Sequence, residues 1–108
     1  MIARIWHGWT TPDNADAYER LLREEIFHAI EAKDVTGYLG IQLLRRPIDT
    51  GEVEFVTTMW FDSIEAVRQF AGEAYETAYV PDAARSVLAR FDATSAHYEV
   101  REDRSPGH

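Results

Sequence analysis

The chain contains no cysteine and no long apolar run. Without thiols it cannot form disulfides, thiolate nucleophiles or zinc–cysteine sites. A membrane-spanning helix needs about 20 apolar residues in succession, and the chain has no such segment. The N-terminal stretch also lacks the apolar core and the small-residue cleavage site of a signal peptide. These absences favour a cytoplasmic protein without a membrane segment.

Positive charge is scarce as well. The 108 residues include 19 acidic and 11 basic side chains, which gives a net charge of −8, and no basic run exceeds Arg45-Arg46. Nucleic acids and anionic membranes are recognised through basic patches that meet phosphates, so neither is an expected partner. The sequence has no GxSxG, phosphate-loop or GxGxxG motif, so it gives no sign of a nucleophile elbow or a nucleotide site.

Apolar side chains make up 45% of the sequence, which is ordinary for a globular protein. The length fits one domain, which we expect to span residues 1–101. Residues 102–108 are polar and contain proline and glycine, so we expect a frayed tail there.

Residue patterns predict the order of the elements. Thr11-Pro12-Asp13 combines an N-cap residue, a first-turn proline and an acid, so a helix should run from Pro12 to about Lys33. A second helix should begin at Asp62-Ser63, where Asp62 and Glu65 have capping-box spacing, and a further helix should begin at Pro81. Alternating apolar, β-branched and aromatic residues predict strands over 2–9, 38–46, 53–61 and 94–101.

The order β-α-β-β-α-β predicts an α+β, ferredoxin-like fold: a four-stranded antiparallel sheet with both helices on one face. Both faces of the strand 53–61 are largely apolar, so the face without helices needs cover from a second subunit. We therefore expect a homodimer. The interface is expected to contain Phe55, Met59, Arg4 and Trp6 or, with the opposite strand parity, Val56, Trp60, Ile5 and His7.

His7 is the main candidate for a catalytic residue. A neutral imidazole that faces an apolar cavity can act as a general base near neutral pH, and the alternative is a satisfied core histidine. His7 and His97 lie on strands that should be neighbours, but a metal site there would need Glu54 or Glu99 as well. We expect no metal site.

The aromatic residues have two interpretations each. Trp60, at the end of a strand, is either a core residue or one wall of a pocket that stacks on a flat ligand. Tyr75 and Tyr79, four residues apart, are packing residues or part of the same pocket.

The passages TTMWFDSIEAVRQFAG, YETAYVPDA and HYEV together resemble the antibiotic biosynthesis monooxygenase-like proteins of the dimeric α+β barrel superfamily. The resemblance covers about residues 1–101. It implies that two ferredoxin-like subunits press their open sheet faces together, and that each subunit holds a pocket between sheet and helices. Members include cofactor-independent monooxygenases that oxidise polycyclic aromatic phenols with dioxygen, and haem-degrading enzymes.

From this resemblance we expect a monooxygenase that needs neither metal nor flavin and acts on a flat aromatic or phenolic molecule. His7 would take up the phenolic proton. The residues that would bind the substrate are Trp60, Trp9, Phe70, Tyr75, Tyr79 and His97. The alternative is a non-catalytic small-molecule binding or assembly protein of the same fold.

The haem-degrading branch uses an asparagine on strand 1, and a tryptophan and an iron-ligating histidine on the second helical segment. The corresponding positions here hold His7, about Phe70, and Tyr79, and none of the three matches. The resemblance therefore implies no specific haem binding and no cofactor.

Overall fold

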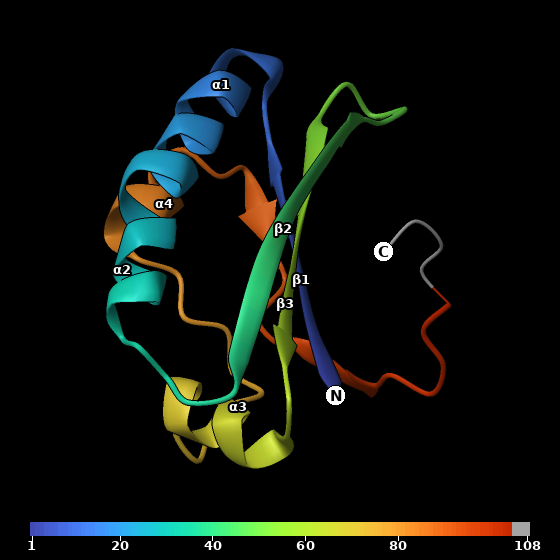
Figure 1. Cartoon of the computed structure of the whole chain (residues 1–108). Coiled ribbons are helices and arrows are strands. Elements are labelled where there is room, and N and C mark those ends of the chain that lie inside the picture. The colour runs from blue at the N-terminus through green and yellow to red at the C-terminus, as the bar shows by residue number, and fades with distance from the viewer. Residues whose placement is uncertain (105–108) are drawn as a thin grey trace.

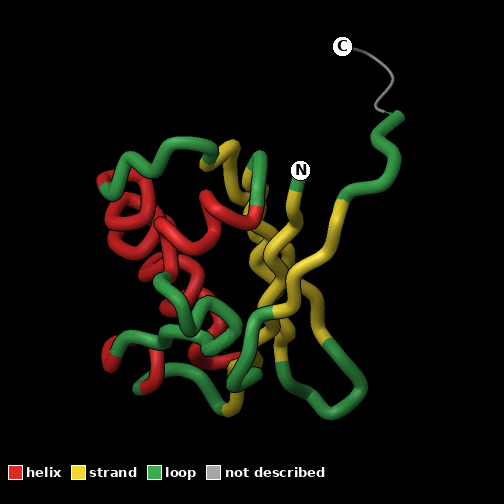
Figure 2. The backbone as a smooth tube through the Cα atoms, turned by 90° about the horizontal axis from the view of Figure 1, so that it is seen from below, coloured by secondary structure: helices red, strands yellow, loops and turns green. Residues whose placement is uncertain are grey.

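The structure, a computed structural model, describes residues 1–104, and over them an antiparallel sheet of five strands forms one layer (Figure 1). The helices form a second layer on one face of that sheet (Figure 2). The strands are β1 (Ile2–Thr10), β2 (Tyr38–Pro47), β3 (Val53–Phe61), β4 (Arg90–Phe91) and β5 (Ala96–Glu99). The helices are α1 (Pro12–Leu21), the π-helical η1 (Leu22–Ile26), α2 (Phe27–Ala32), α3 (Ile64–Ala71) and α4 (Asp82–Arg85).

The strand order is β2-β3-β1-β4. β5 also pairs with β1, but with residues 2–5 of that strand, whereas β4 pairs with Gly8 and Trp9. The expected α+β, ferredoxin-like arrangement is confirmed, with β1 in the centre. The strand predicted over 94–101 is observed as β5, whereas β4 is an additional short strand in the stretch that the sequence assigns to the helix from Pro81. Asp92 to Ser95, which separate the two strands, leave the ladder with β1. The sheet therefore has five strands rather than four within residues 1–104.

Side-chain alternation along β1 and β3 decides which residues face the helices. Phe55 and Phe61 on β3 are completely buried, and both belong to clusters that pack against helical residues. In the β1–β3 register, Arg4 lies opposite Met59 and Trp6 lies opposite Thr57, so these residues share the helix-covered face. Our first choice for the dimer interface is therefore wrong. The helix-free face carries the alternative set: Ile5, His7, Val56 and Trp60.

The first helical segment has the expected length but is not a regular α-helix. Five residues form the π-helical turn η1, which lies between α1 and α2. A π turn holds more residues than an α turn, so the residues after it are rotated relative to those before it. Phe27, which α-helical spacing from Tyr18 places on the outer side, packs against the core because of this turn.

The cap of α3 also differs from the expectation. Ser63 is the N-cap, and its side-chain oxygen accepts a hydrogen bond of 3.2 Å from the backbone N–H of Ala66. Asp62 lies one residue before the cap, so the proposed capping box from Asp62 to Glu65 is not formed. The helix expected from Pro81 is also short and ends at Arg85. The predicted polar tail, 102–108, lies partly outside the described residues.

Candidate functional site

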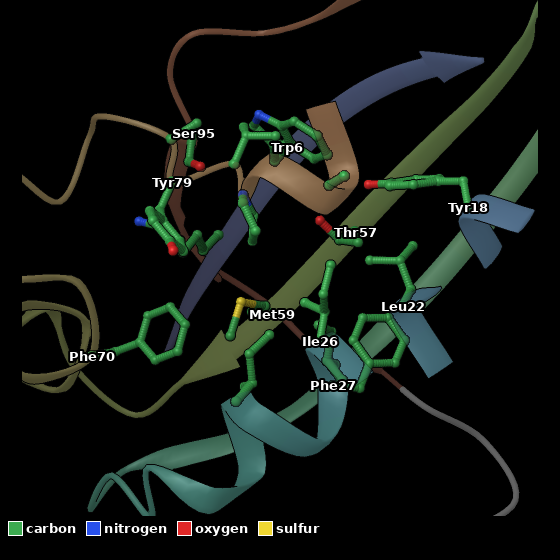
Figure 3. Close-up of a pocket in the computed structure, with 17 residues that line it drawn as sticks. Trp6, Tyr18, Leu22, Ile26, Phe27, Thr57, Met59, Phe70, Tyr79 and Ser95 are labelled. Carbon is green, nitrogen blue, oxygen red and sulfur yellow. The ribbon is translucent and has the colours of Figure 1, made fainter. Parts of the chain in front are cut away.

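One cavity lies between the sheet and the helices and has a volume of about 120 Å³ (Figure 3). Helical residues from α1, η1 and α2 form one wall, β1 and β3 form the floor, and the segment before α4 closes one end. An engineered protein cavity of about 150 Å³ holds one benzene molecule, so this cavity is of a size for a single aromatic ring. Its lining is mostly apolar and includes Leu22, Ile26, Phe27, Ile30, Ile41, Met59, Phe70, Val80 and Ala84.

Tyr18 brings a polar group into this apolar wall. The side chain is 1% exposed, and its ring packs edge-on against Phe55 at 4.9 Å between centroids. Figure 3 shows its hydroxyl directed into the cavity, near Thr57. Among residues 1–104 the hydroxyl has no hydrogen-bond partner. Burial raises the pKa of Tyr18 well above its usual value, so the phenol is a neutral donor and not a base.

Arg4 supplies a charge at the same cavity, which it lines from β1. It is 7% exposed, and its Cζ lies 5.8 Å from the centroid of the Phe70 ring. Its Nη1 donates to the backbone oxygen of Tyr75 at 2.6 Å and lies 2.9 Å from Nε2 of His97. Burial lowers the pKa of Arg4, although a guanidinium remains charged at neutral pH.

The structure divides the predicted site residues into two groups. Phe70 and Tyr79 line the cavity as expected, and Tyr79 is 85% exposed at its edge. Tyr75 and His97 adjoin Arg4, and their rings meet edge-on at 5.1 Å, but neither lines the cavity.

His7, Trp9 and Trp60 lie on the opposite, helix-free face of the sheet. The prediction that His7 and Trp60 line the pocket between sheet and helices is therefore wrong. The proposed approach of His7 to His97 is also wrong, because His97 pairs opposite Arg4 and its side chain contacts the helix-covered face. Both faces of these strands are apolar in sequence, so apolar content does not show which face meets the helices.

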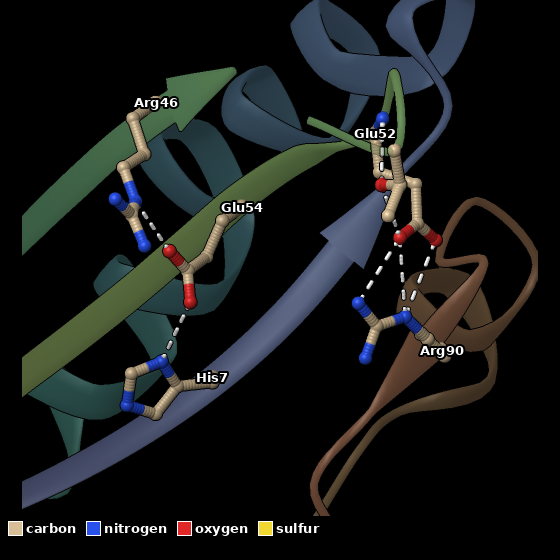
Figure 4. A network of polar contacts seen from close by, with 6 residues as sticks. His7, Arg46, Glu52, Glu54 and Arg90 are labelled. Carbon is tan, nitrogen blue, oxygen red and sulfur yellow. Dashed lines mark hydrogen bonds and ion pairs between the residues drawn. The ribbon is translucent and has the colours of Figure 1, made fainter. Parts of the chain in front are cut away.

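On the helix-free face, His7 belongs to a polar cluster (Figure 4). Its Nδ1 lies 3.1 Å from Oε2 of Glu54, whose other oxygen accepts a bond of 2.7 Å from Nε of Arg46. Arg46 first and His7 second hold the pKa of Glu54 below its usual value. The ring of His7 also stacks on that of Trp9, with 6.0 Å between centroids. A second, more open depression at this cluster has a volume of about 330 Å³ and is lined by His7, Leu44, Arg45, Arg46, Glu54 and Val56.

The residues that sequence reasoning missed are those that give the cavity its polarity. Tyr18 and Thr57 are not among the predicted site residues, and the sequence analysis predicts Arg4 and Trp6 at the subunit interface. One signal was available: Arg4 is a charged residue inside an otherwise apolar strand, on the same face as Trp6. No group of three or more histidine, aspartate or glutamate side chains within residues 1–104 has the geometry to hold a metal ion.

Comparison with known proteins gives a consistent fold. No protein-family model matches the sequence, and no curated protein is significantly similar to it. Solved structures do match. A candidate antibiotic biosynthesis monooxygenase from Bacillus cereus has 18% identity over 99% of this chain and 96% of its own, with a TM-score of 0.64. At that level of identity the likeness shows the fold alone.

The haem degrader MhuD from Mycobacterium tuberculosis, solved with two haems in its active site, has 26% identity over 97% of this chain and 100% of its own, with a TM-score of 0.55. A dimeric ferredoxin-like protein from an uncultured marine organism has 10% identity over 96% of this chain and 91% of its own, with a TM-score of 0.50. The expected fold of the antibiotic biosynthesis monooxygenase proteins is thus confirmed. Within residues 1–104, no helix is long and apolar enough to cross a membrane.

Proposed function

We propose that this chain, which has the fold of the antibiotic biosynthesis monooxygenase proteins, binds a flat phenolic molecule in the cavity beneath α1, η1 and α2 and oxidises it with dioxygen. One ring would occupy the cavity, and further rings would extend past Tyr79 at its edge. The observation that carries the proposal is the hydroxyl of Tyr18, which opens into the cavity. It has no partner among residues 1–104, and an oxygen atom on a bound ring would satisfy it.

The reaction needs no cofactor if the substrate is itself a strong reductant. An anthrone-type CH2 group loses a proton to form an electron-rich enolate, which transfers electrons to dioxygen. One oxygen atom enters the ring as a carbonyl group and the other leaves as water, so that CH2 and O2 yield C=O and H2O. The protein's contribution would be to hold the ring, exclude bulk water and stabilise the oxyanion through donors such as Tyr18.

His7 does not serve as the base in this proposal, because it lies on the other face of the sheet. It belongs instead to the surface that we propose is covered by a second copy of the chain. That surface exposes Leu44 and Tyr98, 53% and 57% accessible, beside Ile5, Val56 and Trp60. An apolar sheet face of this kind favours a homodimer, and one similar structure is of a dimeric ferredoxin-like protein.

The experiment measures oxygen uptake with a panel of anthrones and naphthols, compared with anaerobic incubation. A monooxygenase consumes one dioxygen per product and forms no product anaerobically. Saturable binding of the same compounds without oxygen uptake would instead support the non-catalytic alternative. Tyr18→Phe tests the site, because it removes only the hydroxyl that the proposal uses.

Haem binding is a second candidate function, favoured by the similarity to MhuD. Two observations oppose it. The cavity volume of about 120 Å³ accommodates one ring, so most of a porphyrin would lie outside it. The segment from Phe70 to Phe91 contains no histidine, cysteine or methionine to bind iron. The side chain of this segment that could bind iron at the cavity edge is then the phenol of Tyr79.

A further inference from the structure

Arg4 is a buried cation that pairs with no carboxylate among residues 1–104. Its contacts are a backbone carbonyl, an imidazole nitrogen and the face of Phe70. None of the ion pairs within residues 1–104 includes it. By contrast, Arg45, Arg46 and Arg90, all far more exposed, each pair with a carboxylate. A buried charge without a counter-charge is unfavourable, because its desolvation is not offset by an ion pair.

The cavity beside Arg4 holds no negative charge and no base. Its lining includes no aspartate, glutamate or histidine side chain, within the part of the chain that the structure describes. The polar groups that it does contain are the Arg4 guanidinium and hydroxyls such as that of Tyr18. Both of these are hydrogen-bond donors at neutral pH, and a guanidinium cannot accept.

On the premise of the function given above, we propose that the cavity binds its aromatic ligand as an oxyanion, a phenolate or enolate, with Arg4 as the counter-charge and Tyr18 as a neutral donor. The missing base is then not required in the wall of the cavity. Arg4 favours the ionised ligand, and the proton goes to solvent. The anion is also the electron-rich form that reacts with dioxygen, so binding and activation are one step.

His97 has a positioning role in this arrangement. Its Nε2 lies 2.9 Å from Nη1 of Arg4, so the ring accepts from the guanidinium and is neutral. Burial, and then Arg4, hold the pKa of His97 below its usual value. A neutral imidazole fixes the guanidinium without offsetting its charge, whereas a carboxylate in the same place would neutralise the charge that the ligand needs.

The test uses 4-nitrophenol, a single ring that ionises near neutral pH and absorbs differently as phenol and phenolate. Its absorbance is titrated against pH with and without excess protein. We expect the apparent pKa of the bound probe to fall by about one unit or more, which corresponds to a tenfold preference for the anion. The chain's net charge of −8 acts in the opposite direction, so a fall reports a local charge.

Two comparisons localise the effect. Arg4→Met, which keeps the length of the side chain, should abolish the preference, and Arg20→Met on the exposed side of α1 should retain it. 4-Nitroanisole, which has the same ring but cannot ionise, should bind the native chain at least about tenfold more weakly than the phenolate, which tests the idea without any variant.

The possible failures are distinguishable. Equal binding of phenol, phenolate and 4-nitroanisole would overturn the role of Arg4 and leave the aromatic cavity in place. A preference for the anion that survives in Arg4→Met would also overturn it. Failure of both probes to bind would contradict the proposed function together with this inference.

Discussion

Nη1 of Arg4 lies 2.9 Å from Nε2 of His97, and the two residues are opposite one another in the β1–β5 ladder. The guanidinium can only donate, so His97 must accept through Nε2 and carry its proton on Nδ1. The pair holds only while His97 is neutral. Glu76 acts in the opposite direction on His97, and its effect on the pKa is smaller than those of burial and Arg4.

This relationship predicts a loss of stability in mild acid. The pKa of His97 is lower in the folded chain than its usual value of about 6.5, so below pH 6.5 the unfolded chain binds the proton more tightly. The contribution is present above that pH and is lost as the pH falls through the folded pKa. Urea midpoints measured from pH 7.5 to pH 5 should therefore fall.

The matched variant is His97→Gln, whose side-chain oxygen can also accept from Arg4 and does not titrate. Its urea midpoint should decline less over the same range than that of the native chain. Glu54 and Glu52, whose pKa values are lowered by Arg46 and Arg90 respectively, contribute only below about pH 4.5 and do not interfere. An unchanged decline in His97→Gln would refute the assignment.

The fold was accessible from sequence because each element has its own local signal. Thr11-Pro12 starts the first helical segment, and the strand 53–61 has its predicted bounds. The choice of sheet face was not accessible in the same way. Phe55 and Val56 are both apolar, so period-two alternation did not decide which of them meets the helices.

The site was less accessible for the same reason. Phe70 and Tyr79 were found because they lie on the segment that covers the sheet, whatever its parity. The place of Arg4 depends on which sheet face meets the helices, and helical spacing puts Tyr18 on the side of its helix that faces the core. That assignment is right for the Tyr18 ring, which is buried. Sequence spacing does not show that the hydroxyl at its tip lacks a partner.

Tyr18→Phe should separate ligand binding from stability. The hydroxyl has no partner among residues 1–104, so its removal should change the free energy of unfolding by less than about 1 kcal/mol. Binding of 4-nitrophenol should weaken by about 1 kcal/mol, or roughly fivefold, because one hydrogen bond is lost. Calorimetric titration measures the second quantity. Tyr38→Phe is the control, since Tyr38 packs against Phe61 away from the cavity.

The cap of α3 offers a direct comparison of neighbouring residues. Ser63→Ala removes the bond to the Ala66 N–H and should lower the free energy of unfolding by about 1 kcal/mol. For a chain of this size that corresponds to a fall in Tm of roughly 4–8 °C. Asp62→Ala, one position earlier, should stay within about 0.5 kcal/mol of the native chain. A larger loss of stability in Asp62→Ala than in Ser63→Ala would instead support the capping box from Asp62 to Glu65.

The helix-free face should be covered by a second copy of the chain. Leu44 is 53% exposed and lies beside Val56 on that face, so Leu44→Glu should leave the folded subunit stable and place a charge in the interface. Sedimentation at micromolar concentration should show a dimer for the native chain and a monomer for Leu44→Glu. Ala29→Glu, exposed on the outer side of α2, should remain dimeric. A native chain that sediments as a monomer would contradict the homodimer.

Haem is the ligand for which sequence similarity and local chemistry disagree most. MhuD binds haem at 26% identity, yet Tyr79 stands at the position where the haem-degrading branch implies a histidine. Tyr79 lies at the edge of the cavity and is 85% exposed, so a phenolate ligand there would have little shielding from water. We therefore predict that a haemin titration gives no saturable complex with one haem per subunit.

Two variants make the haem result interpretable. Tyr79→His supplies a neutral imidazole at the cavity edge, so any latent porphyrin site should then give a shifted Soret band. His7→Ala should change nothing, because His7 lies on the opposite face of the sheet from Tyr79. A sharp, stoichiometric Soret band in the native chain that is lost in Tyr79→Phe would contradict the prediction. It would show that the helices open enough to admit a porphyrin, and haem binding would replace phenol oxidation as the better-supported function.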